Sequence, residues 1–164
     1  MEIRKIDCLE SILEVEKIAK IIWEEHFTPI IGKEQVSYML DKFLSKDVIA
    51  TSIDKDGYMF YGMYENDALI GFTSVHPEEE LLFLSKLYIL KEKRGNAFAR
   101  TTLAFLEAIA KAKGLKGIWL TCNKYKHTTL AIYKHMGFEI FDEAVNDIGN
   151  GYVMDDYYLR KYIF

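Results

Sequence analysis

The hydrophobic pattern changes its period near Gly57, and this change constrains the fold more than any other feature of the sequence. Before that point, apolar residues such as Ile12, Ile18 and Ile22 recur at helical spacing. After it, short β-rich runs separated by turn residues alternate with two further helical segments. This order predicts an α/β chain of the α+β type, with a mixed central sheet of about six to seven strands and flanking helices.

The N-terminal third is expected to be mostly helical after a short strand at residues 2–6. The first amphipathic helix should end near Phe27, because Pro29 and Gly32 punctuate the chain. Apolar residues from Val36 to Phe43 predict a second helix, and residues 47–53 predict a third segment.

The remaining chain predicts a β-meander, then a βαβα unit, then two more strands. Gly114 and Gly137 close the two helices of that unit. Turn-forming residues from Asp147 to Gly151 separate the last two strands. No repeat or linker interrupts the pattern, so a single domain covering residues 1–164 is expected. The expected strands are 58–64, 69–75, 81–90, 117–122, 138–145 and 152–163, and the expected helices are 99–113 and 128–136.

Composition excludes several classes of protein. The formal net charge is −4 with scattered basic residues, which argues against nucleic acid as a partner and mildly favours a cationic one. Cys8 and Cys122 lie far apart, outside any zinc-ligand spacing, so neither a disulfide framework nor a metal site is predicted. No signal-peptide pattern or membrane-length apolar run occurs, so a cytoplasmic protein without a membrane partner is expected.

A small-residue loop joins the strand ending at Leu90 to the helix beginning near Ala99. Backbone N–H groups at a helix N-terminus attract phosphate, and small side chains let a pyrophosphate approach that backbone. A tight strand-to-helix turn without a ligand has the same appearance. The loop lacks both the P-loop GK(S/T) pattern and the GxGxxG fingerprint, so nicotinamide binding is disfavoured.

The spacing of Arg94, Ala97 and Ala99 resembles the acetyl-CoA-binding signature of GNAT acetyltransferases, Q/R-x-x-G/A-x-G/A. The downstream chain adds a second match, where that family has a strand and a helix containing a Tyr and closed by Gly-Phe. The resemblance implies the GNAT fold, acetyl-CoA as cofactor, and N-acetyl transfer to an amine. The residues that carry the second match are Asn123, Lys126, Ala131, Tyr133, Gly137 and Phe138.

The resemblance also implies which residues bind the cofactor. Leu87, Tyr88 and Ile89 would pair their backbone with the pantetheine arm, and a backbone N–H near Tyr88 would stabilise the oxyanion. Asn123 would bond the pantetheine, while Lys126 replaces a frequent Asn and would attract CoA phosphates. The pyrophosphate would be held by the loop residues Arg94, Gly95, Asn96, Ala97, Phe98, Ala99 and Arg100.

Acetyl transfer requires a neutral amine and a protonated leaving thiolate. An amine with a pKa near ~10.4 is only about 0.04% neutral at pH 7, which adds roughly 4.6 kcal/mol to the barrier unless a base helps. Tyr133 lies two helical turns after Lys126 on one face, where its phenol could donate a proton to the thiolate. On spacing alone an aromatic in such a helix is more often a packing residue, but the resemblance favours the catalytic acid.

The base is less defined, because Thr121 occupies the strand position where some relatives place a Glu. His76 and the acidic run Glu78 to Glu80 are candidates, and Glu80 lies nearest the strand expected to line the acceptor cleft. A solvated acidic turn explains the same residues. Asp155 and Asp156 could be edge charges facing solvent or one wall of a cation site.

The acceptor predicted from the sequence is a small amine. Residues 29–43 and 147–157 look like the corresponding segments of bacterial polyamine-acetyltransferase-type GNATs. The alternatives are an enzyme that acetylates a peptide N-terminus or protein lysine, and a non-catalytic CoA-binding sensor. Exposed edge strands also make a homodimer an open prediction.

Overall fold

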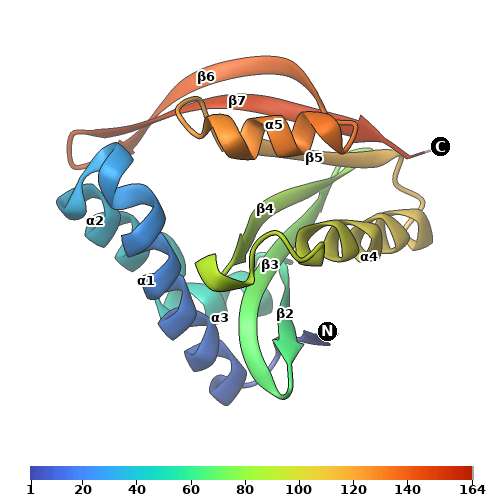
Figure 1. Ribbon diagram of the computed structural model, residues 1–164, viewed down its shortest axis with the longest axis horizontal. Coiled ribbons are helices and arrows are strands. Elements are labelled where there is room, and N and C mark those ends of the chain that lie inside the picture. The colour runs from blue at the N-terminus through green and yellow to red at the C-terminus, as the bar shows by residue number, and fades with distance from the viewer. Residues whose placement is uncertain (164) are drawn as a thin grey trace. The chain divides into compact units, whose positions relative to one another are not determined.

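The computed structural model describes residues 1–163 and contains one mixed sheet of seven strands in the order β1-β2-β3-β4-β5-β7-β6 (Figure 1). This confirms the predicted α+β class and strand number. The strands are β1 (Glu2–Lys5), β2 (Met59–Glu65), β3 (Ala68–Glu78), β4 (Leu81–Ile89), β5 (Gly117–Asn123), β6 (Glu139–Gly149) and β7 (Tyr152–Tyr162). The helices are α1 (Leu9–Ile31), α2 (Lys33–Leu44), α3 (Lys46–Asp54), the short 3-10 helix η1 (Lys91–Lys93), α4 (Phe98–Ala112) and α5 (His127–His135).

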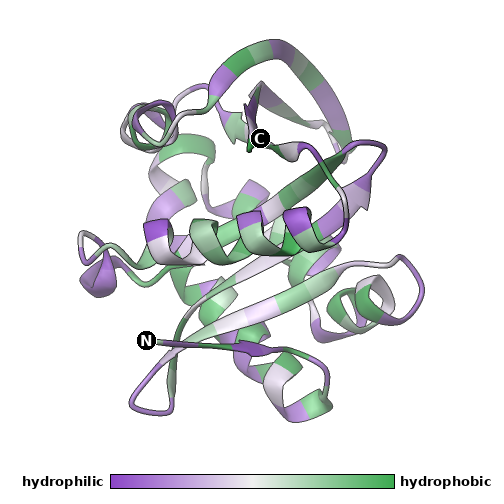
Figure 2. Cartoon of the chain, turned by 90° about the vertical axis from the view of Figure 1, so that its right-hand side faces the viewer, coloured by the Kyte–Doolittle hydropathy of each residue, from purple (hydrophilic) through white to green (hydrophobic). Residues whose placement is uncertain are grey.

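The chain divides into two compact units, which share β4 and α4. The first unit consists of Met1–His76 and Lys86–Thr102, and the second of Pro77–Ser85 and the chain from Leu103 onward. Helices in both units carry hydrophilic and hydrophobic residues in alternation (Figure 2), as amphipathic helices on a core require. Whether residues 1–164 act as one domain stays a prediction.

In the first unit, β1 and β3 pair antiparallel with the two edges of β2. The N–H of Leu90 donates to the carbonyl of Ile70 at 2.9 Å, joining the end of β4 to β3. Gly71 is required at this junction, because a Cβ there would lie 2.5 Å from the carbonyl oxygen of Tyr88. The close approach fixes the backbone of β4 immediately before the small-residue loop.

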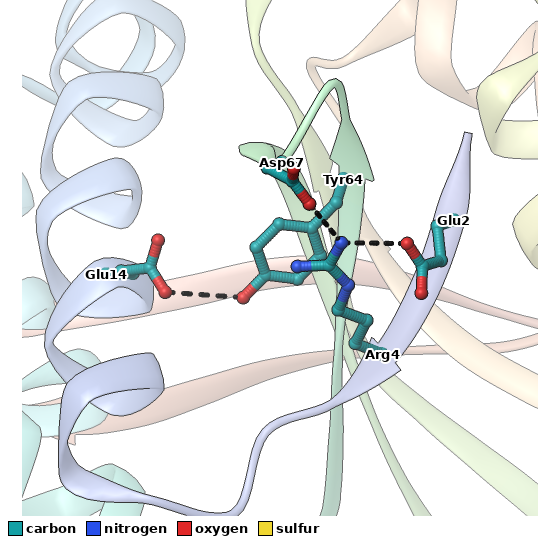
Figure 3. A network of polar contacts seen from close by, with 5 residues as sticks. All are labelled: Glu2, Arg4, Glu14, Tyr64 and Asp67. Carbon is teal, nitrogen blue, oxygen red and sulfur yellow. Dashed lines mark hydrogen bonds and ion pairs between the residues drawn. The ribbon is translucent and has the colours of Figure 1, made fainter.

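A polar network pins the N-terminal strand of the first unit (Figure 3). The Arg4 guanidinium donates to Glu2 at 2.8 Å and to Asp67 at 2.6 Å, and lies over the ring of Tyr64. The Tyr64 hydroxyl in turn donates to Glu14 of α1 at 3.4 Å. Tyr64 is buried, but the ion pairs of Arg4 with Glu2 and Asp67 reach solvent, so these pairs contribute orientation more than stability.

The first helix runs to Ile31, so the prediction that it ends near Phe27 is wrong. Pro29 lies inside its last turn, where a missing N–H removes one helical hydrogen bond and leaves the rest of the helix intact. The helix ends instead at Gly32, whose positive φ of 86° is favourable only for glycine.

In the second unit, β4 pairs parallel with β5 from Leu81↔Gly117 to Leu84↔Leu120. β7 lies between β5 and β6 and is antiparallel to both, so the last strand of the chain is internal to the sheet. Apolar side chains that are at most 2% exposed fill the core of this unit: Leu82, Leu84, Leu106, Ile118, Leu120 and Leu159.

Two turns differ from their predicted positions. Pro77 does not end β3, which continues to Glu78 and turns at Glu79 with a φ of 53°. Asp147 and Gly149 belong to β6, and the turn is the two-residue pair Asn150 and Gly151, both with positive φ. Positive φ at both positions matches the right-handed twist of the flanking strands, which explains the tighter turn.

Candidate active site

Residues 94–97 join η1 to α4, which begins at Phe98, one residue before the predicted Ala99. The short helix η1 between β4 and this loop was not predicted. Gly95 and Ala97 have positive φ values of 82° and 62°. The N–H of Thr101 donates to the carbonyl of Ala97 at 3.0 Å and closes the first turn of α4. The N–H groups of Phe98, Ala99 and Arg100 precede that bond and have no acceptor within the helix. This arrangement fits a pyrophosphate, because those donors and the helix dipole favour an anion.

The polar side chains of the loop maintain its shape. The Nε of Arg94 donates to the carbonyl of Ile89 at 3.1 Å, and Asn96 donates to the carbonyls of Lys93 and Arg94 at 3.2 and 3.4 Å. Burial lowers the pKa of Arg94, and the nearby carboxylates of Glu25 and Glu92 oppose that shift. Arg94 therefore ties the loop to the end of β4.

The β4 residues predicted to bind the pantetheine use their side chains for packing. Leu87 packs with Phe98 and Ala99 against the buried cluster of Met63, Ile70 and Ile89. The Tyr88 ring lies 5.6, 6.2 and 5.7 Å from those of Trp23, Phe27 and Phe72. With these side chains anchored in the first unit, any cofactor contact must come from their backbone.

The second predicted cofactor segment surrounds the end of β5. The N–H of Tyr125 donates to Oδ1 of Asn123 at 2.9 Å, so the side-chain amide N–H groups are the part of Asn123 suited to a ligand. Lys126 caps α5, and its N–H donates to the carbonyl of Asn123 at 3.1 Å. Burial raises the pKa of the Cys122 thiol to about 11, and the Lys126 charge acts in the opposite direction.

Tyr133 lies on α5, with its ring 5.5 Å from the ring of Phe138 in an edge-on arrangement. The residue as a whole is partly exposed, but the protein atoms around the phenol raise its pKa by desolvation, with a further contribution from Cys122. The phenol is therefore protonated throughout the physiological pH range. The phenol can therefore act as a proton donor. It lies close enough to Cys122 for the two side chains to interact electrostatically.

Glu80 lies directly before β4, which begins at Leu81, and its side chain is 67% exposed. Its carboxylate accepts a hydrogen bond from Lys116 at 3.1 Å. His76, another predicted candidate, stacks on Tyr58 with ring centroids 4.8 Å apart. These surroundings leave Glu80 an ion-paired surface carboxylate rather than one tuned by burial.

The sequence pointed to neither of two buried ionisable groups as a proton-transfer residue. Burial lowers the pKa of Lys86 in β4 to about 8, and raises the pKa of Asp156 in β7 to about 6. Lys86 had a visible signal, since it is the one charged residue in the apolar run 81–90. Asp156 was considered only together with Asp155, as an edge charge or one wall of a cation site, because no local signal separates the two neighbouring aspartates.

Comparison with known proteins decides the family. The family model described as acetyltransferase (GNAT) family matches residues 15–138. The chain belongs to the GNAT family of acetyltransferases. This membership confirms the fold and the acetyltransferase class predicted from the two sequence motifs, and acetyl-CoA is the acetyl donor that the predicted signature serves.

Several GNAT relatives cover nearly the whole chain. The spermidine N(1)-acetyltransferase of Thermoplasma acidophilum is 25% identical over 164 residues, covering 96% of this chain and 98% of the relative. The crystal structure of PaiA N-acetyltransferase from Thermoplasma acidophilum in complex with coenzyme A has a TM-score of 0.83 at 21% identity, covering 99% and 100% of the two chains. Aminoglycoside 6'-acetyltransferase type Ii has a TM-score of 0.69 at 19% identity, covering 100% and 98%.

Two further properties concern only the described residues 1–163. No helix there is both long enough and apolar enough to cross a membrane. Nor does that part of the chain contain a group of three or more His, Cys, Asp or Glu side chains arranged to hold a metal ion.

Proposed function

We propose that this GNAT acetyltransferase transfers the acetyl group of acetyl-CoA to a primary amine of a small polyamine-like acceptor. The observation that carries the proposal is the alignment with a spermidine N(1)-acetyltransferase over almost the full length of both chains. A net charge of −4 and the carboxylates of Glu143, Asp155 and Asp156 on β6 and β7 add support, since polyamines are cations at neutral pH.

The cofactor contacts proposed for this chain follow the motifs. The N–H groups of residues 95–100 would bind the pyrophosphate, and the backbone of Leu87 to Ile89 would pair with the pantetheine arm and supply an oxyanion donor. Asn123 would donate its amide N–H to the pantetheine, and Lys126 would attract the CoA phosphates. The positive φ of Gly95 and Ala97 supports the first assignment, because it shapes a concave backbone for an anion.

Tyr133 is proposed as the general acid, which gives its phenolic proton to the leaving thiolate. Its fully protonated phenol supports this role. The raised pKa also has a cost, because a donor much weaker than the thiol transfers its proton uphill. Stabilisation of the phenolate at the moment of transfer, by Lys126 or by solvent, is therefore part of the proposal.

The test is a panel of amines scored by release of free thiol from acetyl-CoA. Spermidine should show a kcat/KM at least about tenfold above that of a monoamine of similar length with an uncharged tail, because opposite charges attract. The ratio should shrink as salt is raised from low to high ionic strength. Equal turnover of the two amines under both conditions would contradict the acceptor class, and a peptide N-terminus as the preferred acceptor would replace it.

A matched pair of variants ties thiol release to the loop. Ala97→Glu should abolish release with every acceptor, because a carboxylate there conflicts sterically and electrostatically with the pyrophosphate. Ala112→Glu makes the same change at the exposed far end of α4 and should retain turnover. If acetyl-CoA stabilises the wild-type protein but none of the amines leads to thiol release, the protein would instead be a CoA-binding sensor.

A further inference from the structure

Asp156 has only 5% of its surface exposed, the lowest exposed fraction of any charged residue among residues 1–163. Within residues 1–163 no ion pair or side-chain hydrogen bond of its carboxylate is found, and Lys124 acts on it only through its charge. Desolvation of a carboxylate that lacks a hydrogen-bonded cationic partner costs folding free energy, so the fold accepts a penalty at this position. Penalties of this kind concentrate where a group has a chemical task.

The neighbouring carboxylate makes the contrast clear. Asp155 and Asp156 are adjacent in β7, so their side chains point to opposite faces of the sheet. Asp155 forms an ion pair with Lys124 at 3.0 Å. The charged groups that act on Asp156 are Asp155, which raises its pKa, and Lys124, which lowers it, while Asp156 itself raises the pKa of the Cys122 thiol.

The register of β5 and β7 relates Asp156 to the proposed acid. Asn123 pairs with Asp156 and Thr121 with Tyr158, so these four residues share one face of the sheet. Cys122 points to the opposite face, and it lies within electrostatic range of both Asp156 and Tyr133. Asp156 and Tyr133 are therefore both close enough to the end of β5 to interact electrostatically with Cys122.

We propose that Asp156 is the general base of the acetyl transfer, an inference that rests on the amine acetylation proposed above. As the C–N bond to the acetyl carbon forms, the Asp156 carboxylate accepts a proton from the amine nitrogen. As the C–S bond breaks, Tyr133 supplies the proton of the thiol. Solvent then returns the proton from Asp156 to Tyr133, so the reaction consumes one amine and one thioester and yields one amide and one thiol.

The electrostatics agree with this role. Burial is the main cause, and Asp155 the second, of a pKa near 6 for Asp156. The carboxylate is thus ionised at pH 7 and above, ready to accept a proton, and a stronger base than an exposed carboxylate. Glu80, by contrast, has a side chain that is 67% exposed and paired with Lys116.

The test is the pH dependence of kcat/KM with spermidine for wild type and Asp156→Asn. In the wild type the logarithm of kcat/KM should rise with a slope of two below about pH 6, where both Asp156 and the amine must lose a proton, and a slope of one above it. Asp156→Asn should lower kcat/KM by about 10²- to 10³-fold at pH 7.5 and leave a slope of one throughout.

Control variants keep the test independent of folding. Glu139→Gln removes an exposed carboxylate of β6 that pairs with Arg160, at 3.6 Å, and should stay within about twofold of wild type with the break near pH 6 intact. Asp156→Glu retains a carboxylate, so the pH profile of its kcat/KM should still show a change of slope. Each variant is checked for a thermal shift with acetyl-CoA, which reports a folded protein.

Two outcomes would overturn the proposal. One is an Asp156→Asn enzyme that keeps both its turnover and the break near pH 6. The other is an Asp156→Asn enzyme in which only the KM for spermidine rises and the slope of log kcat/KM against pH still changes near pH 6. That result would assign Asp156 to cation binding. Failure of the acetyltransferase function itself is a separate result, because the wild type would then release no thiol with any amine.

Discussion

The chain has two acidic runs that look alike in sequence and differ in the folded protein. Glu78 to Glu80 lie at the turn between β3 and β4, where Glu79 is exposed and Glu80 pairs with Lys116. Asp155 and Asp156 lie inside β7, a strand with a neighbour on each side. In the turn both charges reach solvent, whereas alternation along a strand sends one aspartate to Lys124 and buries the other.

The difference shows that the surroundings of an acidic residue decide how strongly its carboxylate binds a proton. An exposed, ion-paired glutamate such as Glu80 stays in contact with water, which can replace most of its interactions. A buried aspartate without a cationic partner holds its proton more tightly and is ionised only at a cost in folding free energy. Three predictions test whether proton transfer belongs to the second region rather than to the turn.

The largest effect is expected for Tyr133→Phe, which tests the acid that accompanies Asp156. The ring and its contact with Phe138 remain, so folding and acetyl-CoA affinity should persist. Loss of the phenolic proton should lower kcat by about 10²- to 10⁴-fold, towards the smaller value where solvent reaches the thiolate. Steady-state and single-turnover kinetics measure this decrease in kcat. A folded variant within about twofold of wild type, with chemistry rate-limiting, would reduce Tyr133 to a packing residue.

An intermediate effect, on stability, is expected for Asp156→Asn. The folded pKa of about 6 exceeds the ordinary value of 3.8, so the stabilising contribution of the protonated group is complete below pH 3.8 and is lost as pH rises through 6. At pH 7.5 the amide avoids this loss and should stabilise the fold by up to about 3 kcal/mol.

The measurement is the difference in Tm between Asp156→Asn and wild type at two pH values. The variant should melt roughly 4 to 10 °C higher at pH 7.5 and close to the wild type near pH 3.8 or below. A variant that gains stability while losing turnover would show that the buried carboxylate is kept for function. Equal destabilisation at both pH values would mean that Asp156 has an unrecognised structural partner.

The smallest effect is expected for Glu80→Gln. The pair with Lys116 joins side chains that are 67% and 54% exposed, so its loss should change the free energy of unfolding by less than about 1 kcal/mol. Turnover should stay within about twofold of wild type, with the pH profile unchanged. A loss of more than tenfold in kcat, with the break near pH 6 removed, would reverse the comparison and make Glu80 the base.

Local signals in the sequence accounted for the elements that local rules control. The period change near Gly57 and the glycines at 114 and 137 predicted the strands and the two later helices within a few residues. The spacing of Arg94, Ala97 and Ala99 matched the cofactor signature of the family, and the binding of a pyrophosphate by this loop stays a prediction. The end of α1 was wrong because one proline in a last turn costs less than the packing of the helix gains.

The identity of a base depends on contacts between distant segments, which only the tertiary structure decided. Nothing within β7 distinguishes Asp155 from Asp156 until the last strand inserts between β5 and β6. That insertion sets the register in which Asp156 faces Asn123, next to Thr121 on the same face, while Asp155 reaches Lys124. Burial, and with it the pKa of a carboxylate, is a property of the assembled sheet, because desolvation comes from atoms far away in the sequence.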